Sequence, residues 1–198
     1  MNFIFVSPNF PHTYWNFCDR LKKNGVNVLG IGDAPYDSLE EPLKAALTEY
    51  YKVGNMENYD EMYRAVAYFA FRYGKIDWLE SNNEHWLAND ARLRRDFNIT
   101  TGVQPDELAL WQSKSAMKPV YRAAGIPSAR QCKVTDLAAA REFLDEVGGY
   151  PLFAKPDTGV GADDTWKIDN DAQLEAFFVE KSDYPYVMEE FITGDVYS

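Results

Sequence analysis

The sequence predicts an open, doubly wound α/β domain with a parallel sheet, followed by a small α+β domain. Over residues 1–102, short apolar runs alternate with helical stretches, and such alternation favours parallel strands joined by right-handed crossovers. After residue 102 the pattern changes, because two strand-like runs near residues 153 and 166 are joined by a loop too short for a crossover. These two strands must therefore pair in antiparallel fashion.

The first domain, residues 1–102, contains the clearest alternation. Strands are expected at 3–6, 26–31, 50–53 and 76–79, and helices at 11–23, 39–47, 59–73 and 84–97. The helix over 59–73 has apolar residues at 62, 66, 69 and 73, which share one face. Ligands of such sheets gather beyond the carboxyl ends of the strands, where the loops at 7–9 and 81–84 are expected.

Residues 103–127 are predicted to form a helical linker, and residues 128–198 a small α+β domain. The linker would hold helices at 105–111 and 113–124, the second ended by Gly125-Ile126-Pro127. In the small domain we expect strands at 129–133, 151–156, 165–168 and 186–191, with helices at 136–147 and 171–180.

Composition excludes several classes of function. The net charge of -11 argues against nucleic acid as a partner. No segment approaches the roughly 20 apolar residues that span a bilayer, so we expect no membrane partner and a cytoplasmic location. Cys18, Cys132 and the two histidines fit no ligand spacing, and no metal site is predicted within the chain. The composition is compatible with a homodimer.

Two common nucleotide motifs are missing. The turn after the first predicted strand, Ser7-Pro8-Asn9-Phe10-Pro11, has no glycine, so it lacks the dinucleotide-binding pattern G-x-G-x-x-G. The P-loop sequence G-K-S/T is also absent. Any nucleotide site must be of another kind.

Lys155 is the first candidate for chemistry, because it lies at the end of an apolar strand where a lysine needs a counter-charge. Gly159 and Gly161 follow in a short loop, and glycines let backbone N–H groups approach an anion. A lysine beside such a loop predicts a phosphate cradle. The alternative is a lysine paired with Asp157 or Glu189 beside an ordinary hairpin loop.

Glu189 and Glu190 are the second candidate, on a strand whose side chains alternate between faces. One of them should be solvated, and the other could accept a hydrogen bond from an adenine amino group; the alternative is an edge strand with two solvated acids. Lys114 and Lys118 are four residues apart on one helical face, which is either a small basic patch or a solvated face.

Together these segments resemble the ATP-grasp superfamily, most of all its carbamoyl-phosphate-synthase and biotin-carboxylase-like branch. The resemblance rests on five segments in order: 113–118 (SKSAMK), 124–127 (AGIP), 150–156 (YPLFAKP), 159–161 (GVG) and 187–194 (VMEEFITG). It implies that residues 1–102 are a pre-ATP-grasp domain and 128–198 a small ATP-grasp lid subdomain. The match stops before the catalytic half, so we expect a truncated N-terminal part.

The resemblance implies ATP as the cofactor and assigns roles to seven residues. Lys114 and Lys155 would contact phosphates, Gly159 and Gly161 would close over them, Glu189 would accept from the adenine amino group, and backbone groups of Glu190 and Ile192 would bind the adenine edge. Magnesium ions would be held mainly by residues absent from this chain, and no catalytic residue is predicted. Two departures are Asp163 and Asp164, whose charges would repel phosphate, and Val196, where many members have a glutamate.

The predicted function is therefore the ATP-binding portion of a ligase that activates a carboxylate as an acyl phosphate for attack by an amine. The isolated chain would be inactive, since it lacks the metal-binding half. Asn9, Asn83 and Glu84 are candidate contacts for the substrate, and helix capping is their alternative role. Two rival interpretations are a catalytically silent nucleotide-binding module and an α/β scaffold without a ligand.

Overall fold

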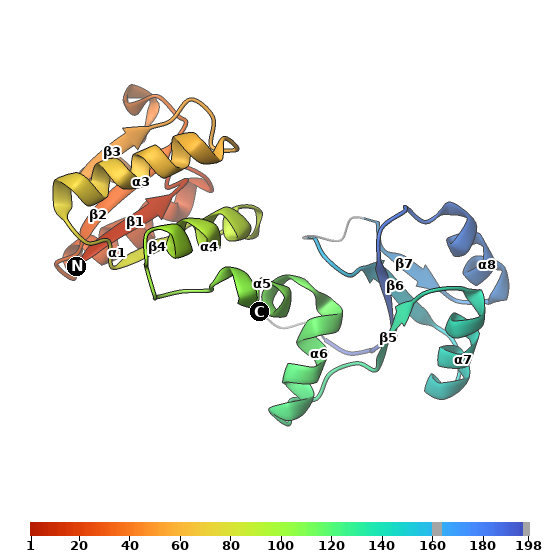
Figure 1. The fold of residues 1–198 in the computed structure, drawn as a ribbon. Helices are drawn as coiled ribbons and strands as arrows, with labels where there is room; N and C mark the ends of the chain where they lie inside the picture. The colour runs from red at the N-terminus through yellow and green to blue at the C-terminus, as the bar shows by residue number, and fades with distance from the viewer. Residues whose placement is uncertain (160–163, 196–198) are drawn as a thin grey trace. The chain divides into compact units, whose positions relative to one another are not determined.

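The computed structural model describes residues 1–159 and 164–195 of the chain. It divides into two compact units, Met1–Leu108 and Ala109–Ser198, which are described separately (Figure 1). Within the described ranges, no helix has the length and apolar character needed to cross a membrane.

A parallel sheet forms the centre of the first unit, as the sequence predicted. Its strands are β1 (Asn2–Val6), β2 (Asn27–Gly32), β3 (Glu49–Lys52) and β4 (Trp78–Glu80), in the order β3-β2-β1-β4. Every pairing is parallel, with Asn2 opposite Asn27 and Phe3 opposite Trp78. The chain thus extends the sheet from β1 in one direction and then, with β4, in the other.

The helices of the first unit are α1 (Trp15–Lys23), α2 (Glu41–Ala46), α3 (Tyr59–Tyr73) and α4 (Leu87–Asp96). Short 3₁₀ turns accompany them at η1 (His12–Tyr14), η2 (Tyr36–Ser38), η3 (Glu84–Trp86) and η4 (Pro105–Glu107). The helices expected to start at residues 11 and 84 therefore begin as 3₁₀ turns, which are common at helix starts.

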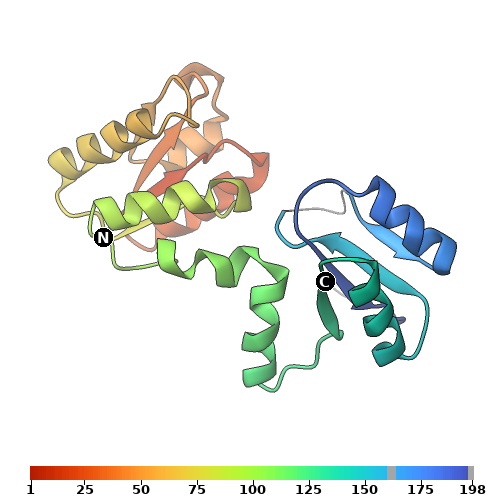
Figure 2. The ribbon, with the colours of Figure 1, turned by 45° about the vertical axis from the view of Figure 1, so that its right-hand side comes forward.

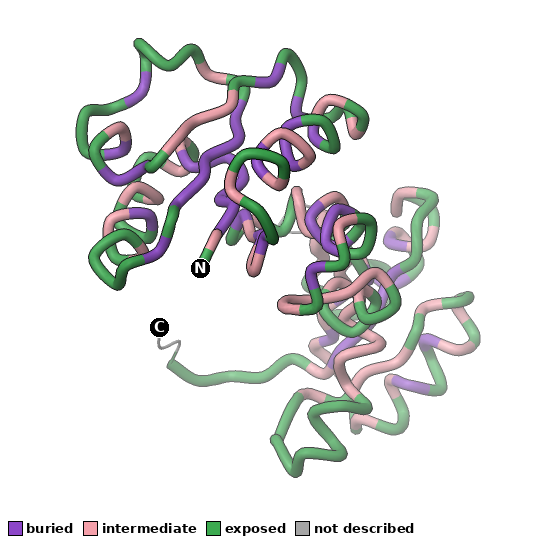
Figure 3. Tube along the Cα trace, turned by 60° about the vertical axis from the view of Figure 1, so that its left-hand side comes forward, coloured by how far each residue is buried: buried purple, intermediate pink, exposed green. Residues whose placement is uncertain are grey.

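Two apolar layers enclose the sheet, one on each face. Phe3 and Phe5 face α1 and α2, whereas Ile4 and Val6 face α3 and α4, because side chains alternate along a strand. The buried residues follow the strands in Figure 3. Burying one such side chain stabilises the fold by about 1.5–3 kcal/mol. Because both faces of the sheet carry apolar side chains, helices are needed on both faces to bury them.

The second unit contains an antiparallel sheet. Its elements are α5 (Leu108–Gln112), α6 (Lys114–Ala123), β5 (Gln131–Val134), α7 (Leu137–Val147), β6 (Leu152–Pro156), β7 (Trp166–Ile168), α8 (Asp171–Glu180) and β8 (Tyr186–Glu190). The strand order is β5-β8-β6-β7, and all pairs are antiparallel. The predicted pairing of the strands near 153 and 166 is confirmed, with Phe153 opposite Lys167.

One face of this sheet is apolar and covered by α7 and α8 (Figure 2). Ala154 and Met188 lie in the core beneath these helices. Their strand neighbours Phe153, Lys155 and Glu189 consequently point to the opposite face. The sequence thus places the candidate lysine and glutamate together on the face that α7 and α8 leave open.

Candidate functional site

Lys155 and Glu189 form the centre of the candidate site in the second unit. They lie on the neighbouring strands β6 and β8, and Lys155 Nζ is 2.5 Å from Glu189 Oε2. Glu189 is only 8% exposed. Its other oxygen, Oε1, is 3.0 Å from Lys118 Nζ and accepts a hydrogen bond of 2.8 Å from Gln131 Nε2. Both carboxylate oxygens are therefore held by donors.

The surroundings of Glu189 keep it charged. Burial by itself raises the pKa of Glu189, but the hydrogen bonds from Lys155 and Lys118 outweigh this and hold the pKa below its ordinary value. Lys118 is itself fixed, since its Nζ donates to Ala129 O at 2.8 Å. At neutral pH the site thus presents a carboxylate acceptor between two ammonium groups.

Of the two acids, Glu189 is buried, whereas Glu190 is partly exposed, with a side chain 22% accessible, and is paired with Arg130. Arg130 binds Glu190 through Nε and Nη2, at 2.8 and 2.6 Å from Oε2, and the Arg130 N–H donates to Oε1 at 2.7 Å. Alternation along one strand did not reveal that the more exposed glutamate, Glu190, also pairs with an arginine. Arg130 lies just before the adjacent strand β5, and its guanidinium also donates to the carbonyls of Glu146 and Val147 at the end of α7.

Asp157 connects the end of β6 to the start of α6. Its carboxylate accepts hydrogen bonds from Ser113 Oγ (2.9 Å), Ser115 N (2.7 Å) and Ser115 Oγ (3.0 Å). The Lys114 N–H donates to the Asp157 carbonyl at 2.8 Å. A carboxylate at a helix N-terminus is stabilised by the unpaired N–H groups there. Asp157 is therefore engaged by α6 and is not the partner of Lys155.

The same connection brings Lys114 to the glycine-bearing loop, since Lys114 Nζ donates to Gly159 O at 3.2 Å. Gly159 has φ +113°, a conformation that L side chains rarely adopt, so the glycine is required by the backbone. Gly161 lies outside the described residues. Lys114, Lys155 and Gly159 are thus brought to one end of β6.

The acidic residues of the loop behave differently from expectation where the structure describes them. Asp164 accepts hydrogen bonds from Tyr184 and from Ser182 Oγ, the latter at 2.8 Å. The hydrogen bond from Tyr184 is the largest influence that lowers the pKa of Asp164 to about 2. The carboxylate of Asp164 is therefore hydrogen-bonded to the segment before β8. Asp163 lies outside the described residues.

The backbone groups expected to bind an adenine edge are only partly available. The Glu190 N–H donates to Arg130 O at 3.2 Å, as part of the sheet edge. Among the described residues, none hydrogen-bonds to the backbone of Ile192, which follows β8. The backbone of Ile192 is thus unpaired with respect to the described residues, whereas the N–H of Glu190 is paired.

The residue types on this face fit an adenosine polyphosphate. Lys114 and Lys155 supply cations for phosphate, Glu189 supplies an acceptor for an amino group, and Phe153 supplies an aromatic surface beside them. No three histidine, cysteine or acidic side chains of the described ranges gather closely enough to hold a metal ion. Sequence reasoning missed Gln131, Asp157 and Arg130 as site residues and noted Lys118 only as part of a basic face.

A second candidate site lies at the carboxyl edge of the parallel sheet in the first unit. A cavity of about 480 Å³ is lined there by Ser7, Asn9, Phe10, Asp33, Met56, Asn83, His85 and Trp86. These residues follow β1, β2, β3 and β4. The cavity lies beside β1 and β4, where the order β3-β2-β1-β4 reverses direction. Such a switch point is the usual ligand position in open α/β sheets.

Two of the three predicted substrate residues share this cavity. Asn9 Oδ1 is buried and accepts no hydrogen bond from the described residues; it rests against Gly32, where an added Cβ would come within 3.0 Å of it. Asn83 lines the cavity and also caps η3 by accepting from the His85 N–H at 3.0 Å, so its alternative role is real. Glu84, the first residue of η3, is not among the lining residues.

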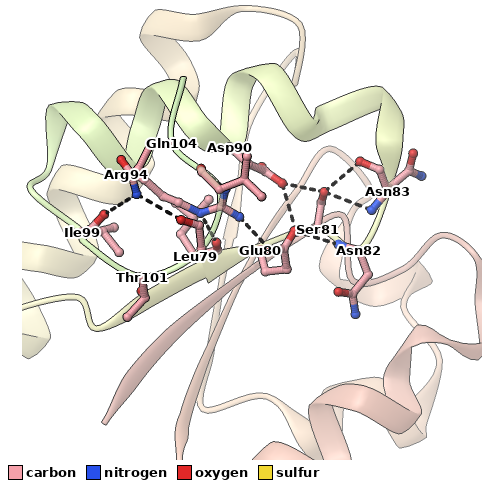
Figure 4. A network of polar contacts seen from close by, with 12 residues as sticks. Leu79, Glu80, Ser81, Asn82, Asn83, Asp90, Arg94, Ile99, Thr101 and Gln104 are labelled. Carbon is pink, nitrogen blue, oxygen red and sulfur yellow. Dashed lines mark hydrogen bonds and ion pairs between the residues drawn. The ribbon is translucent and has the colours of Figure 1, made fainter. Parts of the chain in front are cut away.

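A buried polar network supports the loop after β4 (Figure 4). Arg94 is fully buried and donates to Leu79 O (2.9 Å), Val103 O (2.7 Å) and Glu80 Oε2 (2.7 Å). Asp90, also fully buried, accepts from Ser81 N at 3.1 Å and from Ser81 Oγ at 2.6 Å. The network thereby fixes residues 81–83 at the rim of the cavity.

The loops that reach the cavity from β1 and β4 each have a residue in the left-handed conformation within their first two positions. Ser7 has φ 54° and Asn82 has φ 53°, values uncommon for residues other than glycine. Backbone of this kind is costly and tends to be kept where a site requires it. This observation singles out the same edge of the sheet as the cavity does.

Comparison with known proteins identifies the class of fold. No family model matches the chain. The structure superposes on an L-amino acid ligase from Bacillus licheniformis with a TM-score of 0.64, at 16% identity, over 98% of this chain and 44% of that one. For the biotin carboxylase domain of a 2-oxoglutarate carboxylase from Hydrogenobacter thermophilus, solved with MgADP, ADP and bicarbonate, the TM-score is 0.71 at 19% identity, over 96% of this chain and 44% of that one. The N5-carboxyaminoimidazole synthetase from Staphylococcus aureus, solved with ADP, gives 0.70 at 17% identity, over 96% and 46%.

These neighbours are ATP-grasp ligases, and the chain shares the fold of part of each of them, so the predicted resemblance to the ATP-grasp superfamily is confirmed at the level of the fold. Among curated sequences, the chain is similar to alanine–anticapsin ligase of Bacillus subtilis strain 168, with 28% identity over 152 residues. The matching protein of Bacillus amyloliquefaciens is 27% identical over 135 residues, 61% of this chain and 28% of that protein. The first match covers 69% of this chain and 31% of that relative, so the chain spans less than a third of the relative's length.

Proposed function

We propose that this chain provides the ATP-binding front part of an ATP-dependent ligase that joins a small carboxylate to an amine through an acyl phosphate. The single observation that carries the proposal is the position of Lys155 and Glu189, in contact on the sheet face that α7 and α8 leave open. The likeness to ATP-grasp ligases, two of them solved with ADP, supports a nucleotide as the ligand of that face.

Each residue on the face then has a role toward the nucleotide. Lys155 and Lys114 neutralise phosphate oxygens, Glu189 accepts from the adenine amino group, and the backbone of Ile192 binds the adenine edge. Gly159 allows the loop backbone to approach the phosphates. Bound ATP would supply the phosphoryl group that activates the carboxylate, and the lysines would stabilise negative charge on it.

The proposal is tested by titrating the chain with MgADP. Lys155→Ala should weaken MgADP binding about 10- to 100-fold, because one hydrogen bond to a charged group contributes about 1.5–3 kcal/mol. Isothermal titration calorimetry measures this directly. Lys133→Ala is the matched control, since Lys133 is an exposed lysine on β5, a strand separated from β6 by β8, with no ion pair to a described residue.

Three outcomes would each contradict part of the proposal. Equal affinities of Lys155→Ala and the unsubstituted chain would remove Lys155 from the site. Absence of binding by any form of the chain, at millimolar MgADP, would instead favour a scaffold role. An adenosine polyphosphate that binds in the expected manner without turnover by the complete protein would favour a catalytically silent nucleotide-binding module.

A further inference from the structure

The cavity at the switch point of the first unit has an unusual lining for a sheet edge of this kind. Within residues 1–108, all of which the structure describes, no lysine or arginine lines it. Asp33 is the acidic lining residue, is exposed, and forms no hydrogen bond or ion pair with another described residue. Its carboxylate is therefore free to pair with a ligand.

Backbone N–H groups hold phosphate in many α/β sheets, but most of those in the two loops of this edge already donate to other groups of the chain. After β1, the Ser7 N–H donates to Ile31 O at 2.8 Å and the Phe10 N–H to Ser7 O at 3.3 Å, while Pro8 and Pro11 have none. The loop therefore offers an anion few donors.

In the loop after β4, the backbone N–H groups of residues 81–83 are likewise unavailable to an anion. The N–H groups of Ser81, Asn82 and Asn83 donate to Asp90 Oδ2 (3.1 Å), Glu80 Oε1 (3.3 Å) and Ser81 Oγ (3.2 Å). Two of these acceptors, Asp90 and Glu80, are carboxyl groups next to the loop. The His85 N–H is likewise occupied, by Asn83 Oδ1 at 3.0 Å. Charge and hydrogen bonding thus both disfavour a phosphate at this edge.

The remaining lining suits a cation. Phe10 and Trp86 provide aromatic rings, whose faces attract ammonium groups, and Met56 adds an apolar surface. Asn9 contributes an amide oxygen that accepts no hydrogen bond from the described residues. Carboxylate, amide oxygen and aromatic ring are the groups that recognise a protonated amine.

We propose that the switch-point cavity binds the ammonium group of a small molecule, with Asp33 as its counter-charge and Phe10 and Trp86 as its aromatic walls. The assignment of that molecule as the amine substrate rests on the proposed ligase function, whereas the preference for a cation rests on the cavity alone. Asn9 and Asn83 orient the occupant through their side-chain amides.

The test is nuclear magnetic resonance of the ¹⁵N-labelled chain with L-alaninamide as the probe. L-alaninamide should shift the side-chain amide signals of Asn9 and Asn83 and the indole signal of Trp86. Propionamide, which has the same skeleton without the ammonium group, and inorganic phosphate should not. Equal shifts with propionamide or phosphate, or no shift with L-alaninamide, would overturn the proposal.

Variants separate the charge from the rest of the cavity. Asp33→Asn should weaken L-alaninamide binding about fivefold, the size expected for one partly exposed ion pair. Asp37→Asn, another exposed acid in the loop between β2 and β3, should leave it unchanged; an equal loss in both variants contradicts the assignment. Phe10→Leu, at a residue 60% exposed and outside the core, should also weaken binding and gives a second measurement independent of Asp33.

A parallel MgADP titration distinguishes the two sites, because Asp33 and Lys155 belong to different units. Asp33→Asn should leave MgADP affinity unchanged. Binding of L-alaninamide without binding of MgADP would reject the nucleotide assignment and leave the cation site standing. Binding of MgADP without binding of L-alaninamide would reject the cation site alone.

Discussion

Arg94→Leu should destabilise the first unit by about 3–5 kcal/mol, the range seen when one member of a buried ion pair is removed. The side chain of Arg94 is 0% exposed, and its three hydrogen bonds end on Leu79 O, Val103 O and Glu80 Oε2. Without the guanidinium, two carbonyls and a largely buried carboxylate lose their donors. The loss of stability arises from these unpaired groups more than from the space left by the smaller leucine side chain.

Urea denaturation followed by the amide signals of residues 1–108 measures this effect separately from the second unit. The matched control is Arg95→Leu. Arg95 is the next residue, its side chain is 57% exposed, and its ion pair with the exposed Asp106 is long, at 3.7 Å. Surface changes of this kind are usually within about 0.5 kcal/mol. If the two leucine variants lost the same stability, the buried network would not support this unit.

Asp90 should make the stability of the first unit fall as pH rises from about 4 to about 7. Burial raises the pKa of Asp90 from 3.8 to about 7, and the charge of Glu80 adds to this, while Ser81 and Arg94 oppose it. The folded unit therefore holds a proton that the unfolded chain releases near pH 4. Stability from this group is present below pH 4 and is lost as pH approaches 7. A shift of this size corresponds to roughly 4 kcal/mol.

Asp90→Asn removes the titration and keeps the size of the side chain. The difference in unfolding free energy between this variant and the unsubstituted chain should grow from pH 4 to pH 7 in favour of the variant. Denaturation curves at several pH values measure it. Asp106→Asn, at a side chain that is 92% exposed, should show no such trend. A pH-independent difference for Asp90→Asn would show that Asp90 is ionised throughout.

The sequence was a good guide to the order of strands and helices. The alternation of apolar runs with helical stretches predicted the parallel sheet. The short loop between the strands near residues 153 and 166 predicted the antiparallel pair. Helices α3 and α8 were predicted to the residue, because Asn58 and Asn170 cap their starts. The 3₁₀ starts at residues 12 and 84 were missed, since periodicity does not separate a 3₁₀ turn from a first helical turn.

The candidate sites were less predictable, because they depend on which residues meet across elements. The pairing of Lys155 with Glu189 was foreseen only as one of two choices, and it was decided by the register of β6 against β8. The partners of Arg130 were not predicted, and Asp157 was considered only as a partner of Lys155, since the actual contacts join segments 60 and 42–44 residues apart. The network of Asp90 and Arg94 lies within a helix whose polar face gave no sign of burial.

The contact between Lys155 and Glu189 has a consequence for which molecules can occupy their face. Each group already satisfies the other, so an incoming molecule must exchange partners rather than simply fill a vacant position. In the proposed nucleotide complex, a phosphate would compete with Glu189 for Lys155, and Lys118 would still balance the charge of Glu189. A nucleoside without phosphates has no anionic group to replace Glu189 as the partner of Lys155. Under the proposed function, this ion pair would therefore favour nucleotides over adenosine.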